Sequence, residues 1–182
     1  MANICSTSIV IEGSKETLDK ILNAVKNHET EEKTCWEYGG NILCALGIKP
    51  DDFDNYGCMS SFEEVEPTED KDVFKLRLEW EDRWMRGEFV EKLQEAFPDI
   101  AIYWNAEEFG CEYWETNDWD GKYFSNRFAV VSDEDWEYFE TEDNMLNYLK
   151  ENFDIDSLDE IEDYNENNED GNTVTVYECE EE

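Results

Sequence analysis

The sequence predicts an α+β fold: an antiparallel sheet with helices on one face, followed by an acidic helical extension. Short segments in which apolar and polar residues alternate recur along the chain, which is typical of half-buried strands. Stripes of apolar residues at helical spacing separate several of them. Acidic residues are concentrated late, since residues 1–91 hold 21 acidic and 10 basic residues and residues 92–182 hold 29 and 4. We therefore expect an α+β domain over residues 1–131 and an acidic helical extension with a C-terminal edge strand over residues 132–182.

The first strand and the first helix have the clearest patterns. Residues 4–12 alternate as a strand whose apolar face carries Cys5, Thr7, Ile9 and Ile11. Gly13 interrupts this strand, and Ser14 is placed to cap the helix that follows. The apolar stripe of that helix repeats at intervals of three and four residues, at Leu18, Ile21, Leu22 and Val25.

Residues 28–72 are predicted to form an insertion with little regular structure, apart from a short helix over residues 41–46. Glycine and proline interrupt this stretch repeatedly. The pattern becomes regular again at residues 73–81, which form an alternating strand. We expect a helix over residues 87–96, ended by Pro98, then strands over residues 100–104 and 111–115 joined by a turn.

The sequence after residue 117 predicts one further apolar strand and then mainly helix. An Asp-Gly turn at residues 118–121 precedes an apolar strand over residues 123–131. Ser132 and Asp135 resemble a capping box, which predicts a helix to Phe139 that resumes after Thr141 as far as residue 152. Ser157 and Glu160 predict a short helix over residues 158–164. Residues 173–179 alternate as an edge strand, and residues 180–182 are expected to fray.

The net charge of −36 restricts the function more than any motif does. Aromatic residues make up 14% of the chain, so it folds rather than forming an acidic tail. A polyanion is repelled by nucleic acid and by anionic membranes, and basic protein surfaces are its natural partners. The alternative is that the charge serves solubility alone, although about 2–8 charges suffice for that in a small domain.

No pattern of residues predicts an enzyme. The six cysteines form no C-x-x-C pair and His28 is the single histidine, so we expect no metal site and no cofactor. A phosphate-binding glycine loop and a nucleophile with a base are both missing from the sequence. Pairs of carboxylates are frequent by chance when fifty residues are acidic. With neither an export signal nor an apolar segment of membrane-spanning length, we expect a cytoplasmic protein.

Two short runs resemble a known family. The chain opens with the run Met1-Ala2-Asn3-Ile4-Cys5-Ser6-Thr7, and later carries Phe97-Pro98-Asp99-Ile100 and Glu107-Glu108-Phe109-Gly110. These runs resemble the YubB-like ferredoxin-fold proteins of phages, plasmids and integrated elements, whose opening is roughly M-x-N-x-C-x-N, although Thr7 stands where that pattern has Asn. The resemblance covers residues 1–27 and 73–115. It implies a ferredoxin-like first half and a mobile-element origin, and it implies no chemistry.

In size and charge the chain also resembles acidic inhibitors of host defence. We expect an anti-CRISPR protein that blocks DNA binding by the type II RNA-guided nuclease, itself a basic protein with its guide RNA. The alternatives are an anti-restriction protein that imitates DNA, and an interaction module of a mobile element with no inhibitory role. The oligomeric state is open between a monomer and a homodimer.

Carboxylates of the second half are the candidates for contact with that partner. They are Asp118, Asp120, Asp133, Glu134, Glu137, Glu140, Asp159, Glu162 and Asp163. On the predicted helices several stand three or four residues apart, which brings their Cβ atoms to about 5–6 Å. Together they would form a negative ridge, and the alternative is an ordinary solvated helix face. Aromatic and acidic residues also alternate in residues 113–120, which would suit capture of a DNA-reading arginine pair unless those aromatics belong to the core.

Overall fold

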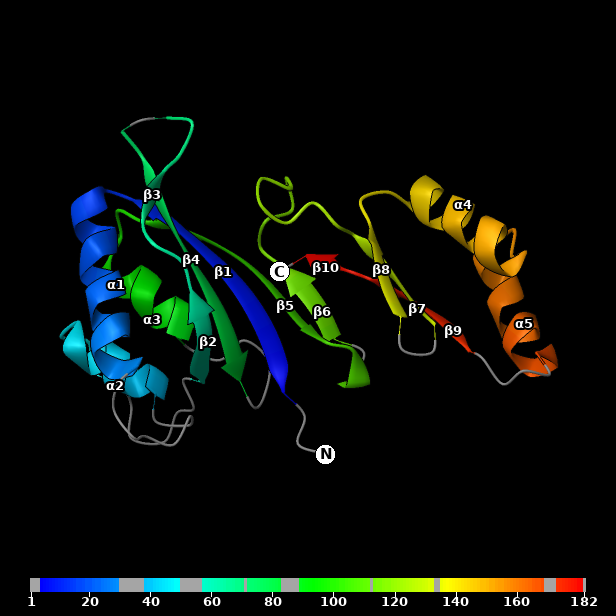
Figure 1. The fold of residues 1–182 in the computed structure, drawn as a ribbon, viewed down its shortest axis with the longest axis horizontal. Coiled ribbons are helices and arrows are strands. Elements are labelled where there is room, and N and C mark those ends of the chain that lie inside the picture. The colour runs from blue at the N-terminus through cyan, green and yellow to red at the C-terminus, as the bar shows by residue number, and fades with distance from the viewer. Residues whose placement is uncertain are drawn as a thin grey trace. The chain divides into compact units, whose positions relative to one another are not determined.

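The computed structural model describes residues 4–29, 38–49, 57–70, 72–82, 89–111, 113–132, 135–168 and 173–181. Their fold is α+β, as predicted, with helices and strands in each of two compact units, Met1–Tyr113 and Trp114–Glu182 (Figure 1). Among these described ranges, no helix is long and apolar enough to cross a membrane.

Unit 1, Met1–Tyr113, is built on an antiparallel sheet with strand order β5-β1-β4-β2. The strands are β1 (Cys5–Gly13), β2 (Cys58–Phe62), β4 (Phe74–Asp82) and β5 (Ala101–Glu108), and the short β3 (Glu66–Pro67) pairs with β4. The central strand β1 lies opposite both neighbours, with Ile9 paired to Leu78 and to Trp104. Their side chains are fully buried, so the predicted strands and their apolar faces are confirmed. In β1 the other face is buried as well at Val10 and Glu12.

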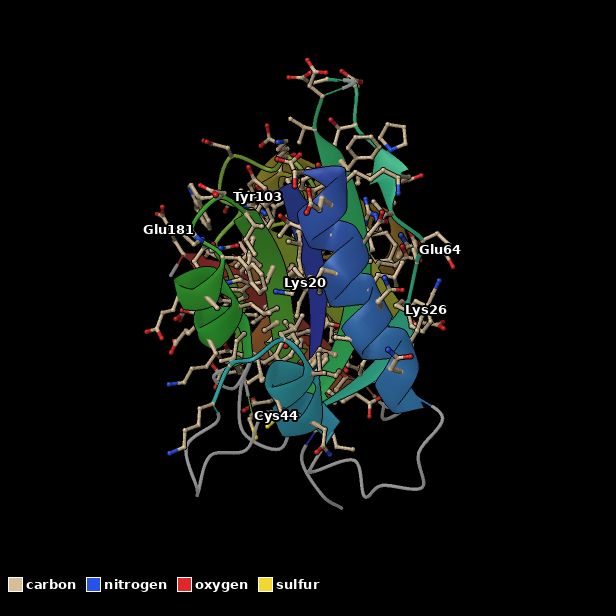
Figure 2. All side chains as sticks on the ribbon, turned by 90° about the vertical axis from the view of Figure 1, so that its left-hand side faces the viewer. Lys20, Lys26, Cys44, Glu64, Tyr103 and Glu181 are labelled. Carbon is tan, nitrogen blue, oxygen red and sulfur yellow. The ribbon has the colours of Figure 1, made fainter. Side chains whose placement is uncertain are left out.

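Three helices cover one face of this sheet, α1 (Lys15–Glu29), α2 (Tyr38–Ala45) and α3 (Phe89–Ala96), as Figure 2 shows. The hydroxyl of Ser14 accepts a hydrogen bond from the Thr17 N–H (3.1 Å), which confirms it as the cap of α1. The apolar stripe of α1 is buried against the sheet. The ring of Phe89 stacks on that of Trp80, with centroids 3.9 Å apart, and this contact fixes α3 on β4.

The expectation that residues 28–72 form an insertion with little regular structure is wrong for the part that the structure describes. Helix α2 begins three residues before the predicted 41–46 and ends at Ala45, and β2 joins the sheet at the far side of β4. The pairing shifts between Met59 and Ser61, so β2 contains a bulge that breaks the two-residue alternation. Residues 30–37 and 50–56 lie outside the described residues.

Unit 2, Trp114–Glu182, contains an antiparallel sheet with strand order β8-β7-β9. Its strands are β7 (Phe128–Ser132), β8 (Asp135–Phe139) and β9 (Val174–Glu178), and its helices are α4 (Glu142–Phe153), α5 (Ile161–Asn167) and the 3-10 turn η3 (Leu158–Glu160). Val130, Met145, Leu149, Ile155 and Val174 are its buried apolar core. The other 3-10 turn, η2 (Phe109–Cys111), precedes β6 (Tyr113–Thr116), which pairs in parallel with β10 (Glu180–Glu181).

Two predictions for the second half are wrong. Residues 135–139 form strand β8 rather than a helix, because the alternation of Trp136 and Tyr138 with acids suits pairing with β7 better than the apparent capping box suits a helix. The cap of the following helix is Thr141, whose hydroxyl accepts from the Asn144 N–H (3.3 Å). The chain end does not fray at residues 180–181, since β10 pairs with β6.

The structure also divides the chain at a different point from the sequence-based prediction. The expected boundary between residues 131 and 132 falls within β7, which is paired along its whole length with β8 and β9. Strand pairing of residues 128–132 therefore places them in the same compact unit as α4 and α5. The predicted strand over residues 123–131 is shorter than expected, and β9 is the expected edge strand.

Candidate acidic interface

The two units differ in how their acidic side chains are used. In unit 1, basic side chains lie beside acids from neighbouring segments, as for Lys26 of α1 and Glu64 in Figure 2. Lys75 of β4 likewise lies 3.0 Å from Glu66 of β3. Unit 2 has 24 acidic residues and three basic ones, a net charge of −21. Its surface is therefore far more negative than pairing within the unit could neutralise.

All three basic side chains of unit 2 are engaged at defined places. The Lys150 ammonium pairs with Asp156, and this hydrogen bond raises the pKa of Lys150. The Lys122 ammonium lies 5.4 Å from the centre of the Tyr123 ring. Arg127 donates hydrogen bonds to backbone carbonyls of residues 118–126. None of these cations belongs to η3, α5 or β9, although the charge of Glu160 on η3 also contributes to the raised pKa of Lys150.

Asp118 is a structural residue rather than a surface contact. Its side chain is only 2% exposed, and its carboxylate accepts hydrogen bonds from the backbone N–H groups of Lys122 (3.1 Å), Tyr123 (2.6 Å) and Phe124 (2.9 Å). The Asp118 N–H in turn donates to the Thr116 hydroxyl (3.0 Å). The prediction that Asp118 contacts a partner is therefore corrected. The carboxylate is needed inside the protein, as the acceptor for three successive backbone N–H groups.

Arg127 closes the same loop from the other side. Its guanidinium donates to the carbonyls of Asp118 and Trp119 (2.8 Å each) and of Phe124 (2.6 Å), and it lies 4.8 Å from the centre of the Trp119 ring. Gly121 adopts φ +71° in the predicted turn, and a Cβ there would lie 3.3 Å from the Ser125 backbone. The loop is thus held by its own polar groups and presents Trp119, which is 44% exposed, beside the exposed Asp120.

The predicted ridge over residues 133–140 does not exist as a helix face. Asp133 and Glu134 lie outside the described residues. Glu137 is exposed on β8, and the carboxylate of Glu140 accepts a hydrogen bond from the Ser125 hydroxyl (2.7 Å). Because Glu137 belongs to a strand and Glu140 follows it, the helical spacing on which the ridge was predicted does not apply to them.

Glu137 instead acts on a tyrosine of the neighbouring helix. Partial burial, and then the charges of Glu137 and Asp135, raise the pKa of Tyr148 on α4. Because the folded state holds the Tyr148 proton more tightly than the unfolded chain does, this group's contribution to stability is present below the ordinary tyrosine pKa of about 10. That contribution is lost as the pH rises through the raised pKa.

Replacing Glu137 by Gln is expected to lower the pKa of Tyr148 toward its ordinary value, because one of the two negative charges that oppose ionisation is removed. The titration is followed by ultraviolet absorbance, as the difference between each protein and the same protein carrying Tyr148→Phe. The matched control is Glu142→Gln, an exposed acid at the start of α4 whose charge is not among the causes of the raised Tyr148 pKa. An unchanged Tyr148 titration in Glu137→Gln would contradict the contact between β8 and α4.

The acids of η3 and α5 are the predicted contact residues that the structure does bring together. Asp159, Glu162 and Asp163 are all exposed within one continuous helical segment, residues 158–167. Within the described ranges, no basic side chain pairs with any of the three. The predicted capping box does not form, since Ser157 makes no side-chain cap and Glu160 accepts from the Asp156 N–H instead (2.8 Å).

A groove beside these acids was not predicted from the sequence. It lies between the η3–α5 segment and β9, is open to solvent and has a volume of about 680 Å³. Its apolar lining comes from Phe128, Leu158, Ile161, Val174 and Val176. Three carboxylates line it as well, those of Glu162, Glu166 and Glu178, and no basic residue does. Leu158 is 41% exposed, and its spacing of three from Ile161 was the available signal for an apolar stripe within an acidic segment.

Comparisons with protein families, with curated proteins and with solved structures find no match to this chain. Any function assigned to it must therefore be argued from its own residues. Of the predicted contact residues, Asp159, Glu162 and Asp163 share one exposed helical segment, whereas Asp120 and Glu137 are exposed on separate elements of the same unit. The arrangement is an exposed negative surface with few basic side chains in the same unit.

Proposed function

We propose that this protein is a phage or mobile-element inhibitor of a host nuclease that binds nucleic acid, and in particular an anti-CRISPR protein that blocks the type II RNA-guided nuclease. The observation that carries the proposal is the charge of unit 2. It has 24 acidic residues and three basic ones, and each basic side chain already contacts a group within the unit. Solubility requires far less charge than this. The protein would act in the cytoplasm of the host cell, as a binding protein without catalysis.

The mechanism is occupation of the basic channel that would otherwise hold target DNA. Exposed carboxylates of η3 and α5 stand three and four residues apart, so two of them can meet neighbouring Lys or Arg side chains of one channel wall. The long-range field of a strongly negative unit also speeds the encounter with a positive cleft. Trp119, exposed beside Asp120, adds an aromatic contact of the kind that anchors interfaces.

The proposed origin rests on the first unit and on the resemblance of the opening residues to the YubB-like proteins. We propose that unit 1 is ferredoxin-like. Its element order β1-α1-β2-β4-α3-β5 and its antiparallel strand order β5-β1-β4-β2 support this, because a ferredoxin-like unit is a split β-α-β-β-α-β arrangement. Helix α2 and strand β3 are then additions to that core. Such a unit is a scaffold and carries no activity by itself.

The test is a binding and cleavage assay with a purified type II nuclease, its guide RNA and target DNA. We expect the protein to prevent DNA binding and hence cleavage, with an affinity that falls at least about tenfold between roughly 50 and 200 mM salt. An affinity that does not change over this range would reject charge-led binding. Full cleavage in saturating protein would reject this partner, and a restriction endonuclease assayed in parallel distinguishes the anti-restriction alternative.

A further inference from the structure

The outer edge of β9 carries backbone groups whose direction can be derived from two contacts. The Cys179 N–H donates to the Arg127 carbonyl (2.9 Å), so residue 179 faces β7. Val174 faces the other way, because its N–H and C=O both bond to the side-chain amide of Asn165 (2.8 Å each). Backbone groups alternate in direction along a strand, and both contacts give the same phase. The N–H and C=O of Val176 and Glu178 therefore point away from β7, on the same side as those of Val174.

Asn165 of α5 acts as a short substitute strand at the first of these positions. Its amide offers one acceptor to the Val174 N–H and one donor to the Val174 carbonyl, which is the pattern that a neighbouring strand would offer. In the sheet order β8-β7-β9, β9 is an outer strand, and among the described residues no strand pairs with its far side. The helix thus covers the edge at Val174 and leaves the edge at Val176 and Glu178 facing the groove.

We propose that this groove binds an extended peptide segment, which adds to β9 as a further strand and carries Lys or Arg side chains alternating with apolar ones. Main-chain pairing at Val176 and Glu178 would supply affinity, as in other cases of strand addition to a sheet edge. The apolar side chains would contact Leu158, Ile161 and Val176. The basic side chains, on the opposite face of the added strand from those that contact Val176, would meet Glu162 and Glu166 on a lining that contains no cation.

Charge complementarity selects the basic partner over the other possible occupants. An acidic or neutral segment would bring no counter-charge to the three carboxylates, and a second copy of this strongly negative chain would be repelled. The choice of a basic segment rests on the proposed function, since it names the part of a cationic nuclease that unit 2 would hold. The main-chain pairing is independent of that function and is tested with a synthetic probe.

The probe is a short, fluorescently labelled peptide of alternating lysine and valine with blocked ends, and binding to the full chain is measured by anisotropy. We expect binding that weakens about tenfold when alternate backbone amides of the peptide are methylated, because the main-chain bonds are lost while the charge is kept. A glutamate-valine peptide should not bind. Equal binding of the methylated peptide, or no binding of the lysine-valine peptide, would overturn the proposal.

The protein variant Val176→Pro tests the same edge from the other side. Its N–H points away from β7, so proline removes no bond of the β7–β9 ladder but removes the outward donor. We expect circular dichroism like that of the parent and about tenfold weaker peptide binding. The second variant, Glu162→Gln with Glu166→Gln, should weaken binding about threefold at low salt, whereas the matched pair Glu142→Gln with Glu151→Gln on α4 should not. Unchanged peptide binding in folded Val176→Pro would overturn the proposal.

The two proposals fail separately. If the protein inhibits the nuclease and folded Val176→Pro inhibits it equally well, the β9 edge is not the contact and the proposed function stands. If the parent protein leaves the nuclease active while the peptide experiments give the expected differences, the proposed function fails and the strand-addition site stands.

Discussion

Replacing Asp118 by Ala is expected to destabilise unit 2 by at least about 3 kcal/mol. The carboxylate accepts from three successive backbone N–H groups at a site that is almost completely buried, so its removal leaves all three without their acceptor. A buried donor that loses its partner costs roughly 1–3 kcal/mol. Urea unfolding followed by circular dichroism measures the change.

Two further substitutions control for the loss of charge and for the loss of volume. Asp120→Ala removes the neighbouring exposed carboxylate and should change stability by less than about 0.5 kcal/mol. Asp118→Asn keeps the shape of the side chain and one acceptor oxygen. Its loss of stability should therefore lie between the losses of Asp118→Ala and Asp120→Ala. If Asp118→Ala proves as stable as the parent, the loop is not held by this carboxylate, and Asp118 returns to the list of contact candidates.

Reversal of the exposed acids on η3 and α5 should have the largest effect on function. The triple variant Asp159→Lys, Glu162→Lys, Asp163→Lys replaces three carboxylates by three cations, in a segment that contains no basic residue of its own. Lost attraction and new repulsion at a basic cleft are expected to weaken binding to the nuclease about a hundredfold. The salt dependence of the remaining affinity should also become shallower. Competition binding at fixed ionic strength measures both quantities.

The matched control places the same change of charge on unit 1. Glu69, Glu95 and Asp99 are exposed there, and their reversal to Lys changes the net charge by the same amount. We expect this control to reduce the rate of association through the weaker overall field and to leave most of the affinity intact. If the two triple variants lose affinity equally, net charge alone governs binding and the η3–α5 surface has no special role.

The elements that could be predicted from the sequence are those whose periodicity is uninterrupted. The stripe from Leu18 to Val25 on α1 and the alternating apolar side chains of β4 are buried in the same core between helix and sheet, so local pattern and tertiary structure agree. Strand β2 was missed because its bulge removes the alternation on which strand prediction depends. Strand β8 was mistaken for a helix because Ser132 and Asp135 imitate a helix cap, and only pairing with β7 decides between the two structures.

Some features of the candidate site could also be predicted from the sequence, and others could not. Composition predicted a negative second half and exposed acids at residues 159, 162 and 163, because surplus carboxylates cannot be buried without partners. It could not separate the buried Asp118 from the exposed Asp120, since the difference depends on which backbone amides the loop turns inward. The groove beside α5 could not be predicted from the sequence either, because β9 and α5 come together through the Asn165 amide only in the folded chain.

The sequence by itself determined the sign and the amount of charge in this protein and the elements of its first half with regular periodicity, because both are properties of neighbouring residues. Tertiary structure alone decided that Asp118 is a structural carboxylate and that β2 and β8 complete the two sheets. It also decided that the edge of β9 faces a groove. Those outcomes depend on hydrogen bonds between segments distant along the chain, and a pattern of neighbours does not contain them.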